Sequence, residues 1–147
     1  MKLSIRLTSS MSAEEMAPFW PDIVACLEKY CRRFGDEETV SNILKQCAEG
    51  RRQLWIVQDE ARRVILTPIT EIVSIDATGE TRLNLAEVGG ERLGECMPLL
   101  EQIEEWARRE HGAKRAALTG RKGWKRLLEP LGYRPTAVIW QKELGRE

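Results

Sequence analysis

Apolar and polar residues recur at regular spacings along most of this chain, and the spacings predict its elements. Lys2 to Thr8 alternates apolar and polar positions, which is typical of a half-buried strand. Clusters of β-branched, leucine and aromatic residues between polar turns predict five further strands, over 51–58, 63–75, 81–88, 115–118 and 136–144. Pro68 cannot donate to a ladder, so the strand over 63–75 is expected to bend there or to lie at a sheet edge.

Four helices are predicted from apolar residues at helical spacing. They cover 14–34, 37–48, 95–109 and 124–131. Asp36 is a candidate N-cap of the second helix, and Gly132 is a candidate stop after the last one. Pro98 fits only within the first turn of the third helix. The predicted order is strand, two helices, three strands, helix, strand, short helix and strand, and its length suits one α/β (α+β) domain over residues 1–147.

Composition argues against several classes of protein. Lys+Arg and Asp+Glu both number 23, so net charge favours neither nucleic acid nor an anionic membrane as a partner. No apolar run reaches the roughly 18 residues of a transmembrane helix, and the polar N-terminus does not resemble a signal peptide. A cytoplasmic location is therefore expected. The four cysteines form no C-x-x-C pair and are expected to be free thiols, with a disulfide or zinc set as the alternative and no metal site predicted.

A glycine-rich turn precedes the third helix, at Gly89, Gly90 and Gly94. Free N–H groups at a helix start and the helix dipole attract anions, so one hypothesis is a phosphate-bearing ligand held between Gly89 and Glu95. The alternative is a strand-to-helix connection that needs glycine for its geometry. The residues alone favour this alternative, because isolated glycine turns are common.

The end of the chain carries a more specific pattern. A strand at Ala116-Ala-Leu118 is followed by a short helix, by Pro130-Leu-Gly-Tyr133 and by a final predicted strand. This ending and the element order of nearly the whole chain resemble the GNAT superfamily of N-acetyltransferases. The stretch Gly120-Arg-Lys-Gly-Trp-Lys-Arg-Leu-Leu128 is similar to the GNAT-like proteins of tailed phages. The resemblance implies a mixed, mainly antiparallel sheet flanked by about four helices.

The resemblance also implies a cofactor site. Acetyl-CoA would lie in a splay between the strand that ends near Val88 and the strand at Arg115, with its pyrophosphate at the helix start near Glu95. A backbone N–H near Val88 would be the oxyanion donor. The residues implied to bind the cofactor are Val88, Gly89, Gly90, Arg92, Leu93, Gly94 and Arg121.

The chain departs from the family pattern where chemistry is concerned. Leu128 stands where the family has its general-acid tyrosine, Arg121 stands where it usually has asparagine, and Glu95 places a negative charge where phosphate is expected. The remaining catalytic candidates are Glu87, as a base beside the splay, and Tyr133. For each, the residues alone favour a structural alternative: a solvated carboxylate for Glu87 and a core-packing ring for Tyr133.

Two further features concern possible partners. The basic turn 121–126 could contact the 3′-phosphate of CoA, nucleic acid or an acidic protein, or it could be a solvated helix face around a buried Trp124. The five tryptophans, including Trp140, all fit core or sheet-cover positions.

Two functions remain open. The first is an acyl-CoA-dependent GNAT N-acyltransferase, or a degenerate relative that keeps CoA binding, acting on a small-molecule or protein amine. The second is a non-enzymatic phage protein that uses the GNAT scaffold as a virion component or to bind a host protein.

Overall fold

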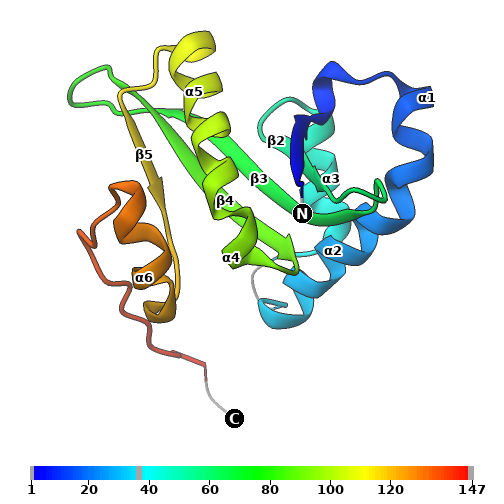
Figure 1. The fold of residues 1–147 in the computed structure, drawn as a ribbon. Helices are drawn as coiled ribbons and strands as arrows, with labels where there is room; N and C mark the ends of the chain where they lie inside the picture. The colour runs from blue at the N-terminus through cyan, green and yellow to red at the C-terminus, as the bar shows by residue number, and fades with distance from the viewer. Residues whose placement is uncertain (1, 36–37, 146–147) are drawn as a thin grey trace.

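The computed structural model describes residues 2–35 and 38–145. Its sheet contains five strands in sequence order: β1 (Ser4–Leu7), β2 (Gln53–Gln58), β3 (Val64–Ser74), β4 (Thr81–Gly90) and β5 (Arg115–Leu118). Neighbours from β1 to β4 are antiparallel, whereas β5 runs parallel to β4. The predicted fold class, an α/β fold with a mixed and mainly antiparallel sheet, is confirmed (Figure 1).

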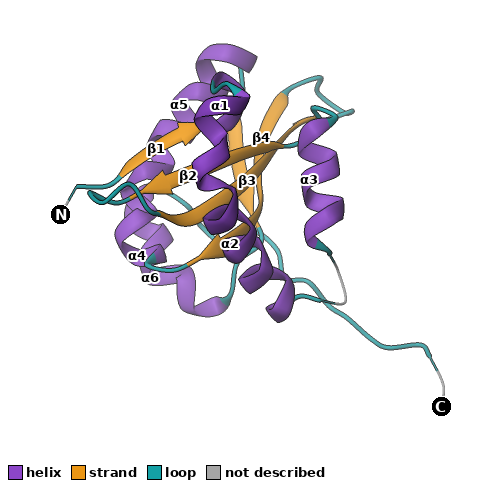
Figure 2. Cartoon of the chain, turned by 90° about the vertical axis from the view of Figure 1, so that its right-hand side faces the viewer, coloured by secondary structure: helices purple, strands orange, loops and turns teal. Residues whose placement is uncertain are grey.

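Helices cover both faces of the sheet. On one face lie α1 (Ala13–Met16), α2 (Trp20–Arg33) and α3 (Val40–Ala48), and on the other lie α4 (Leu93–Cys96) and α5 (Leu100–His111), as Figure 2 shows. The short helix α6 (Lys125–Leu128) follows β5. Thr39 caps α3 by accepting a hydrogen bond from the Asn42 N–H, and the predicted cap Asp36 lies outside the described residues.

Prolines divide the predicted helices into shorter pieces. A 3-10 turn holds Pro18 between α1 and α2, another holds Pro98 between α4 and α5, and a third holds Pro130 after α6. Proline lacks the N–H that an α-helix needs, so each interruption has a local cause. The continuous helix predicted over 95–109 is therefore wrong in detail, because the helical stretch starts at Leu93 and is broken at Pro98.

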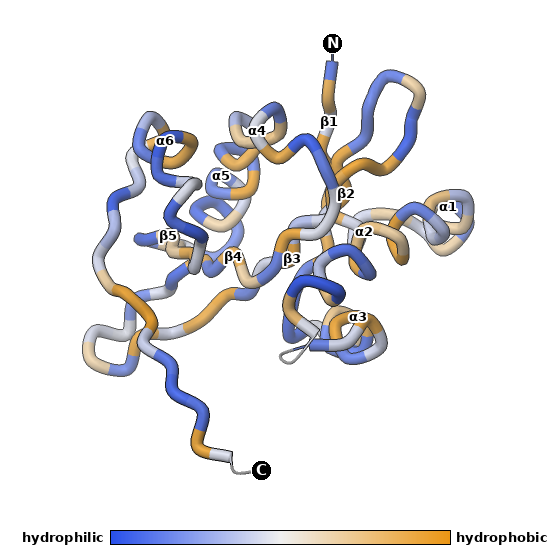
Figure 3. The backbone as a smooth tube through the Cα atoms, turned by 90° about the horizontal axis from the view of Figure 1, so that it is seen from below, coloured by the Kyte–Doolittle hydropathy of each residue, from blue (hydrophilic) through white to orange (hydrophobic). Residues whose placement is uncertain are grey.

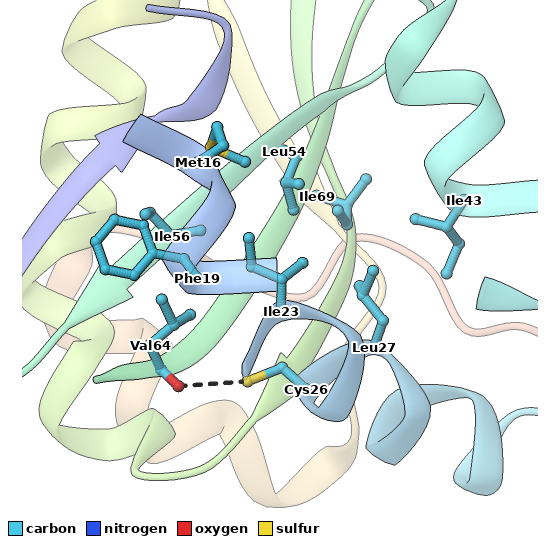
Figure 4. Packing of buried hydrophobic residues seen from close by; sticks show 10 residues of the cluster. All are labelled: Met16, Phe19, Ile23, Cys26, Leu27, Ile43, Leu54, Ile56, Val64 and Ile69. Atoms are coloured by element: carbon cyan, nitrogen blue, oxygen red, sulfur yellow. Dashed lines mark hydrogen bonds between the residues drawn. The ribbon is translucent and has the colours of Figure 1, made fainter. Parts of the chain in front are cut away.

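The core is split between the two faces. Ten buried residues fill the space between α1–α3 and the sheet, among them Ile23, Leu27 and Ile43 from the helices (Figure 4). On the opposite face, Ile103 and Ala107 of α5 pack against Trp55 and Leu83. Both helix layers thus bury a continuous apolar stripe, as the helical spacing predicted.

Gly89 shows how closely α2 lies on β4. A Cβ added at this position would lie 2.3 Å from the carbonyl oxygen of Cys26 in α2. Only glycine allows this approach. The two glycines that were expected to form a turn, Gly89 and Gly90, are instead the last residues of β4.

The prediction of a final strand over 136–144 is wrong. Residues 134–145 form no strand within the described part of the chain, and Trp140 is 89% exposed rather than placed in the core or on the sheet. The edge position suggested for Pro68 is also wrong, because β3 lies between β2 and β4.

The four cysteines are free thiols; Cys26 and Cys96 are buried, and Cys31 and Cys47 are half-buried. Burial raises the pKa of Cys26 to about 11 and has the same effect on Cys47 and Cys96. No helix within the described ranges is long and apolar enough to cross a membrane.

Candidate functional site

The two parallel strands differ in length, so β5 covers only the first part of β4. Pairing between β4 and β5 runs from Arg82–Arg115 to Leu85–Leu118 and stops there, whereas β4 continues to Gly90. The β5-facing edge of residues 86–90 therefore has no strand beside it among the described residues. We call the region beside this free edge, past the end of β5, the splay, after the feature that the family resemblance implies near Val88.

Pro68 determines which backbone groups face the splay. It stands opposite Val88 in the β3–β4 ladder, and it has no N–H to give. The pair must therefore be of the non-hydrogen-bonded kind, in which both residues direct their N–H and C=O groups away from each other. The N–H and C=O of Val88 consequently point away from β3 and into the splay, where β5 no longer meets them.

A bulge turns Glu87 toward the other layer of the protein. Ile69 stands opposite Glu87 and Thr70 stands opposite Leu85, so Ala86 is an extra residue in β4. Opposed residues share a face of the sheet, and Ile69 belongs to the core beneath α1–α3. Glu87 therefore faces the α1–α3 layer, whereas Leu85 and Val88 pack on the face that α4 and α5 cover.

On that face of the sheet, Arg52 binds the carboxylate of Glu87. Nη1 of Arg52 donates to both carboxylate oxygens of Glu87, over 2.9 and 2.7 Å. Only 7% of the Glu87 side chain is exposed, so the alternative that it is a solvated carboxylate is wrong. Arg52 directly precedes β2 and reaches across the sheet to β4.

Two more carboxylates surround the same guanidinium. Glu38 lies 3.6 Å from Nη1 of Arg52, and Glu71 lies 3.4 Å from its Nε, which has no hydrogen-bond partner within the described part of the chain. Glu38 also accepts a bond from the Asn42 amide, and Glu71 accepts one from the Asn84 amide. Three carboxylates share one cation, so the cluster of Glu38, Arg52, Glu71 and Glu87 (the Arg52 cluster) carries excess negative charge.

The surroundings of Glu87 shift its titration. Burial raises the pKa of Glu87 and outweighs the opposing attraction of Arg52, and the charges of Glu38 and Glu71 add to the rise. The three carboxylates raise the pKa of Arg52, against the lowering that burial causes. Glu87 is therefore a stronger base than an exposed glutamate, beside a cation that stays protonated.

The start of α4 carries an internal ion pair. Arg92 is the N-cap, in the left-handed backbone region with φ 62°, and its side chain donates two bonds to Glu95 over 2.9 and 2.8 Å. Glu95 is therefore engaged by Arg92. Gly94 leaves the first turn open, because a Cβ there would meet only the end of Leu127, at 3.8 Å.

An apolar cavity lies on the α4–α5 side of Val88. Its volume is about 30 Å³, and its lining includes Leu85, Leu93 and Cys96. A space of this size takes only a few atoms.

Tyr133 and Arg121 lie on elements that follow β5. The hydroxyl of Tyr133 donates to Glu104 of α5, which together with burial raises the pKa of Tyr133. The ring thus packs on the α5 side, away from the face that holds Glu87. Arg121 is exposed, with its guanidinium 6.0 Å from the ring of Trp124, which is half-buried rather than buried.

Sequence reasoning did not find Arg52, Glu38 or Glu71. They are ordinary charged residues near the ends of elements, and no local spacing connects them to Glu87. Pro68 is instead a sequence signal for Val88. A proline inside a central strand has no N–H to offer, so the residue opposite it directs its backbone groups away from that strand.

Comparison with solved structures finds acetyltransferases with the same fold. The chain has the fold of the GNAT acetyltransferases. An acetyltransferase from Trypanosoma brucei matches with a TM-score of 0.67 and 14% identity, over 97% of this chain and 100% of that one. A GNAT family acetyltransferase from Staphylococcus aureus matches with a TM-score of 0.65 and 14% identity, over 98% and 100% of the two chains.

A third structure was determined with a cofactor. A predicted acetyltransferase with acetyl-CoA from Clostridium acetobutylicum matches with a TM-score of 0.63 and 12% identity, over 97% of both chains. No protein-family model matches the sequence, and no curated protein sequence does. At these identities the likeness is one of fold.

Proposed function

We propose that this chain is a GNAT-type N-acyltransferase that transfers a short acyl group from acyl-CoA to an amine. The observation that carries the proposal is the unpaired backbone of Val88, whose N–H faces the splay. Glu87, the neighbouring residue on the same strand, offers a buried carboxylate on the opposite face. An oxyanion donor and a base thus come from consecutive residues.

The residues around the splay fit CoA. The free edge of 86–90 offers strand-like hydrogen bonds to an extended amide chain, and Gly94 keeps the start of α4 open. Val88, Gly89, Gly90, Leu93 and Gly94 would line the cofactor, and Arg92 and Arg121 are its candidate cationic contacts. The cavity of about 30 Å³ beside Val88 favours a short acyl group such as acetyl.

Acyl-CoA supplies an acyl group activated as a thioester. The amine nitrogen forms an amide bond to the acyl carbon while the carbon–sulfur bond breaks. The Val88 N–H stabilises charge that develops on the acyl oxygen. Glu87 accepts the proton that the amine loses, through a water, and its raised pKa suits this role.

The residue at the family's general-acid position limits the rate that we expect. Leu128 cannot protonate the leaving thiolate, and general-acid catalysis contributes roughly 10²–10⁴-fold. A thiol whose pKa is about 8.5 still departs unaided as a thiolate. Slow turnover is therefore expected.

Two measurements test the proposal. Calorimetry with CoA and acetyl-CoA should detect binding, and thiol release should follow turnover on a panel of amines. Glu87→Gln should keep CoA binding and lower turnover by roughly 10²-fold or more, whereas the surface control Glu105→Gln should change neither. No heat at millimolar CoA would refute the proposal.

The alternative is a non-enzymatic GNAT scaffold that binds a host protein or forms part of a phage particle. Leu128 and Glu95, at positions that the resemblance assigns to chemistry and phosphate, favour it. CoA binding without turnover on any amine would point to a degenerate CoA-binding relative, and co-purification with particles would point to the virion.

A further inference from the structure

Proton transfer to Glu87 removes the closest counter-charge of Arg52. Only 7% of the Glu87 side chain and 17% of the Arg52 side chain are exposed, so water stabilises neither charge fully. When a buried carboxylate takes a proton, the cation bound to it is left unpaired, and a buried unpaired charge is strongly destabilising. An isolated pair of these two residues would therefore oppose the protonation that a general base must undergo.

Two more carboxylates contact the same guanidinium. The carboxylate of Glu71 lies 3.4 Å from Nε of Arg52, and that of Glu38 lies 3.6 Å from Nη1. Three negative charges face one positive charge while all the carboxylates are ionised, and two face it when Glu87 is protonated. Arg52 thus keeps a counter-charge in both states.

Neutral amides hold these two carboxylates in place. Glu71 stands opposite Asn84 in the β3–β4 ladder and accepts a hydrogen bond from its amide over 3.3 Å. Glu38 accepts one from the amide of Asn42, in the first turn of α3. An amide carries no net charge, so it orients a carboxylate without neutralising it. The negative charges of Glu38 and Glu71 therefore remain available to Arg52.

The other titratable groups beside Glu87 add no charge near pH 7. They lie on the face that α2 and α3 cover; Figure 3 shows α3 on the side of β3 and β4 opposite α5. Cys31 of α2 and Cys47 of α3 are neutral thiols, because burial raises the pKa of both. Arg82 of β4 donates to a neutral amide. Among the described residues, Arg52 is the only cation that forms an ion pair with the three carboxylates.

We propose that Glu38 and Glu71 are positioning residues, which keep Arg52 neutralised while Glu87 carries the proton that it takes from the amine. This inference rests on the proposed function and deepens it. The proton leaves the amine nitrogen through a water, and the electron pair of the N–H bond stays on nitrogen as the amide forms. The electrons of the carbon–sulfur bond leave with the thiolate, and Glu87 later returns the proton to solvent.

This arrangement predicts how each carboxylate acts on Glu87. Burial raises the pKa of Glu87, and the charges of Glu38 and Glu71 add to the rise against the attraction of Arg52. Removing either charge weakens the hold of Glu87 on a proton, so the pKa of Glu87 should fall. A base with a lower pKa accepts a proton from the amine less readily, so turnover should fall as well.

The first experiment measures the titration of Glu87 in the folded protein, without turnover. Carbon-13 NMR follows the side-chain carboxyl signals across pH, and the signal that is missing from Glu87→Gln identifies Glu87. Glu71→Gln and Glu38→Gln should each move the titration midpoint of Glu87 to lower pH, and the double variant should move it further. Glu71→Asp, which keeps the charge, should stay closer to the wild type, and the exposed control Glu105→Gln should leave the midpoint unchanged. An unchanged midpoint in both Glu71→Gln and Glu38→Gln would overturn the proposal.

The second experiment measures kcat and KM against pH, with thiol release as the readout. In the wild type, kcat should rise with pH as Glu87 loses its proton. Glu71→Gln should move this rise to lower pH and reduce kcat on the plateau several-fold, with the KM for acyl-CoA unchanged. A purely structural role would reduce the amount of folded enzyme and leave the position of the rise where it is.

The two experiments separate the role of the carboxylates from the proposed function. A midpoint that moves as expected, in a protein that turns over no amine, would refute the acyltransferase and support charge sharing within the Arg52 cluster. Turnover by the wild type, with a pH profile that neither Glu71→Gln nor Glu38→Gln moves, would refute the role of the two carboxylates and leave the proposed function standing.

Discussion

Replacing Arg52 by methionine should be among the most damaging single changes in this protein. The variant keeps most of the side-chain volume and removes the only cation of the Arg52 cluster. Glu87, with 7% of its side chain exposed, would then be a buried carboxylate without a counter-charge, near Glu38 and Glu71. Breaking a buried pair in this way costs about 3–5 kcal/mol. For a domain of this size that loss lowers the melting temperature by roughly 10 °C.

The pH dependence of this loss is the sharper test. Glu87 already has a raised pKa in the folded protein, and removing Arg52 raises it further. The folded variant therefore holds a proton that the unfolded chain releases, so its stability falls as pH rises from the unfolded pKa through the folded one. The defect should be larger at pH 8 than at pH 5, because the stability that a protonated Glu87 contributes is lost as pH rises.

Urea unfolding followed by tryptophan fluorescence at both pH values measures the effect. Adding Glu87→Gln to Arg52→Met should recover much of the loss, because it removes the unpaired charge. Arg63→Met is the matched control: Arg63 also makes two bonds to one carboxylate, that of Asp22, but its side chain is 69% exposed. Solvent screens such a pair, so the control should move the midpoint little. An equal loss at pH 5 and pH 8, or a loss no larger than the control's, would refute the reasoning.

Two further predictions concern β4 and the start of α4. Gly89→Ala places a Cβ 2.3 Å from the Cys26 carbonyl oxygen, so urea unfolding should show a loss of about 1–3 kcal/mol, whereas Gly123→Ala, with nothing within 4 Å, should be tolerated; equal effects would contradict the close packing of α2 on β4. Glu95→Gly releases Arg92 from its ion pair, so calorimetry should show CoA binding several-fold tighter, most clearly at low salt, and Arg92→Ala should weaken it. Unchanged affinity in both variants, with the wild type binding well, would place the phosphate elsewhere.

Local patterns in the sequence determined the elements and their order. Alternation identified β1, helical spacing identified the amphipathic helices, and proline and glycine marked where helices break or stop. These signals are local. A few consecutive residues are enough to set the hydrogen bonds within a helix and to place side chains on the two faces of a strand. The order of elements was then enough to indicate the fold, which the five-stranded sheet confirms.

Glu87 illustrates what local patterns do not contain. In plain alternation it would share a face with Leu83 and Leu85, but the extra residue Ala86 moves it to the opposite face, where Arg52 meets it. A shift of one residue exchanges the faces of a strand, and whether it occurs depends on pairing with a neighbouring strand. The partner lies 35 positions away in sequence, so no spacing rule connects the two.

The C-terminal segment 134–145 shows the same limit. Its residues 136–144 are β-prone and predict a strand, yet they form none in the structure, because a strand exists only where another edge meets it. The sequence by itself thus determined which segments of this protein are able to be helix or strand. Only the tertiary structure decided which faces and edges meet, since burial, ion pairing and strand pairing are relations between residues distant in the chain.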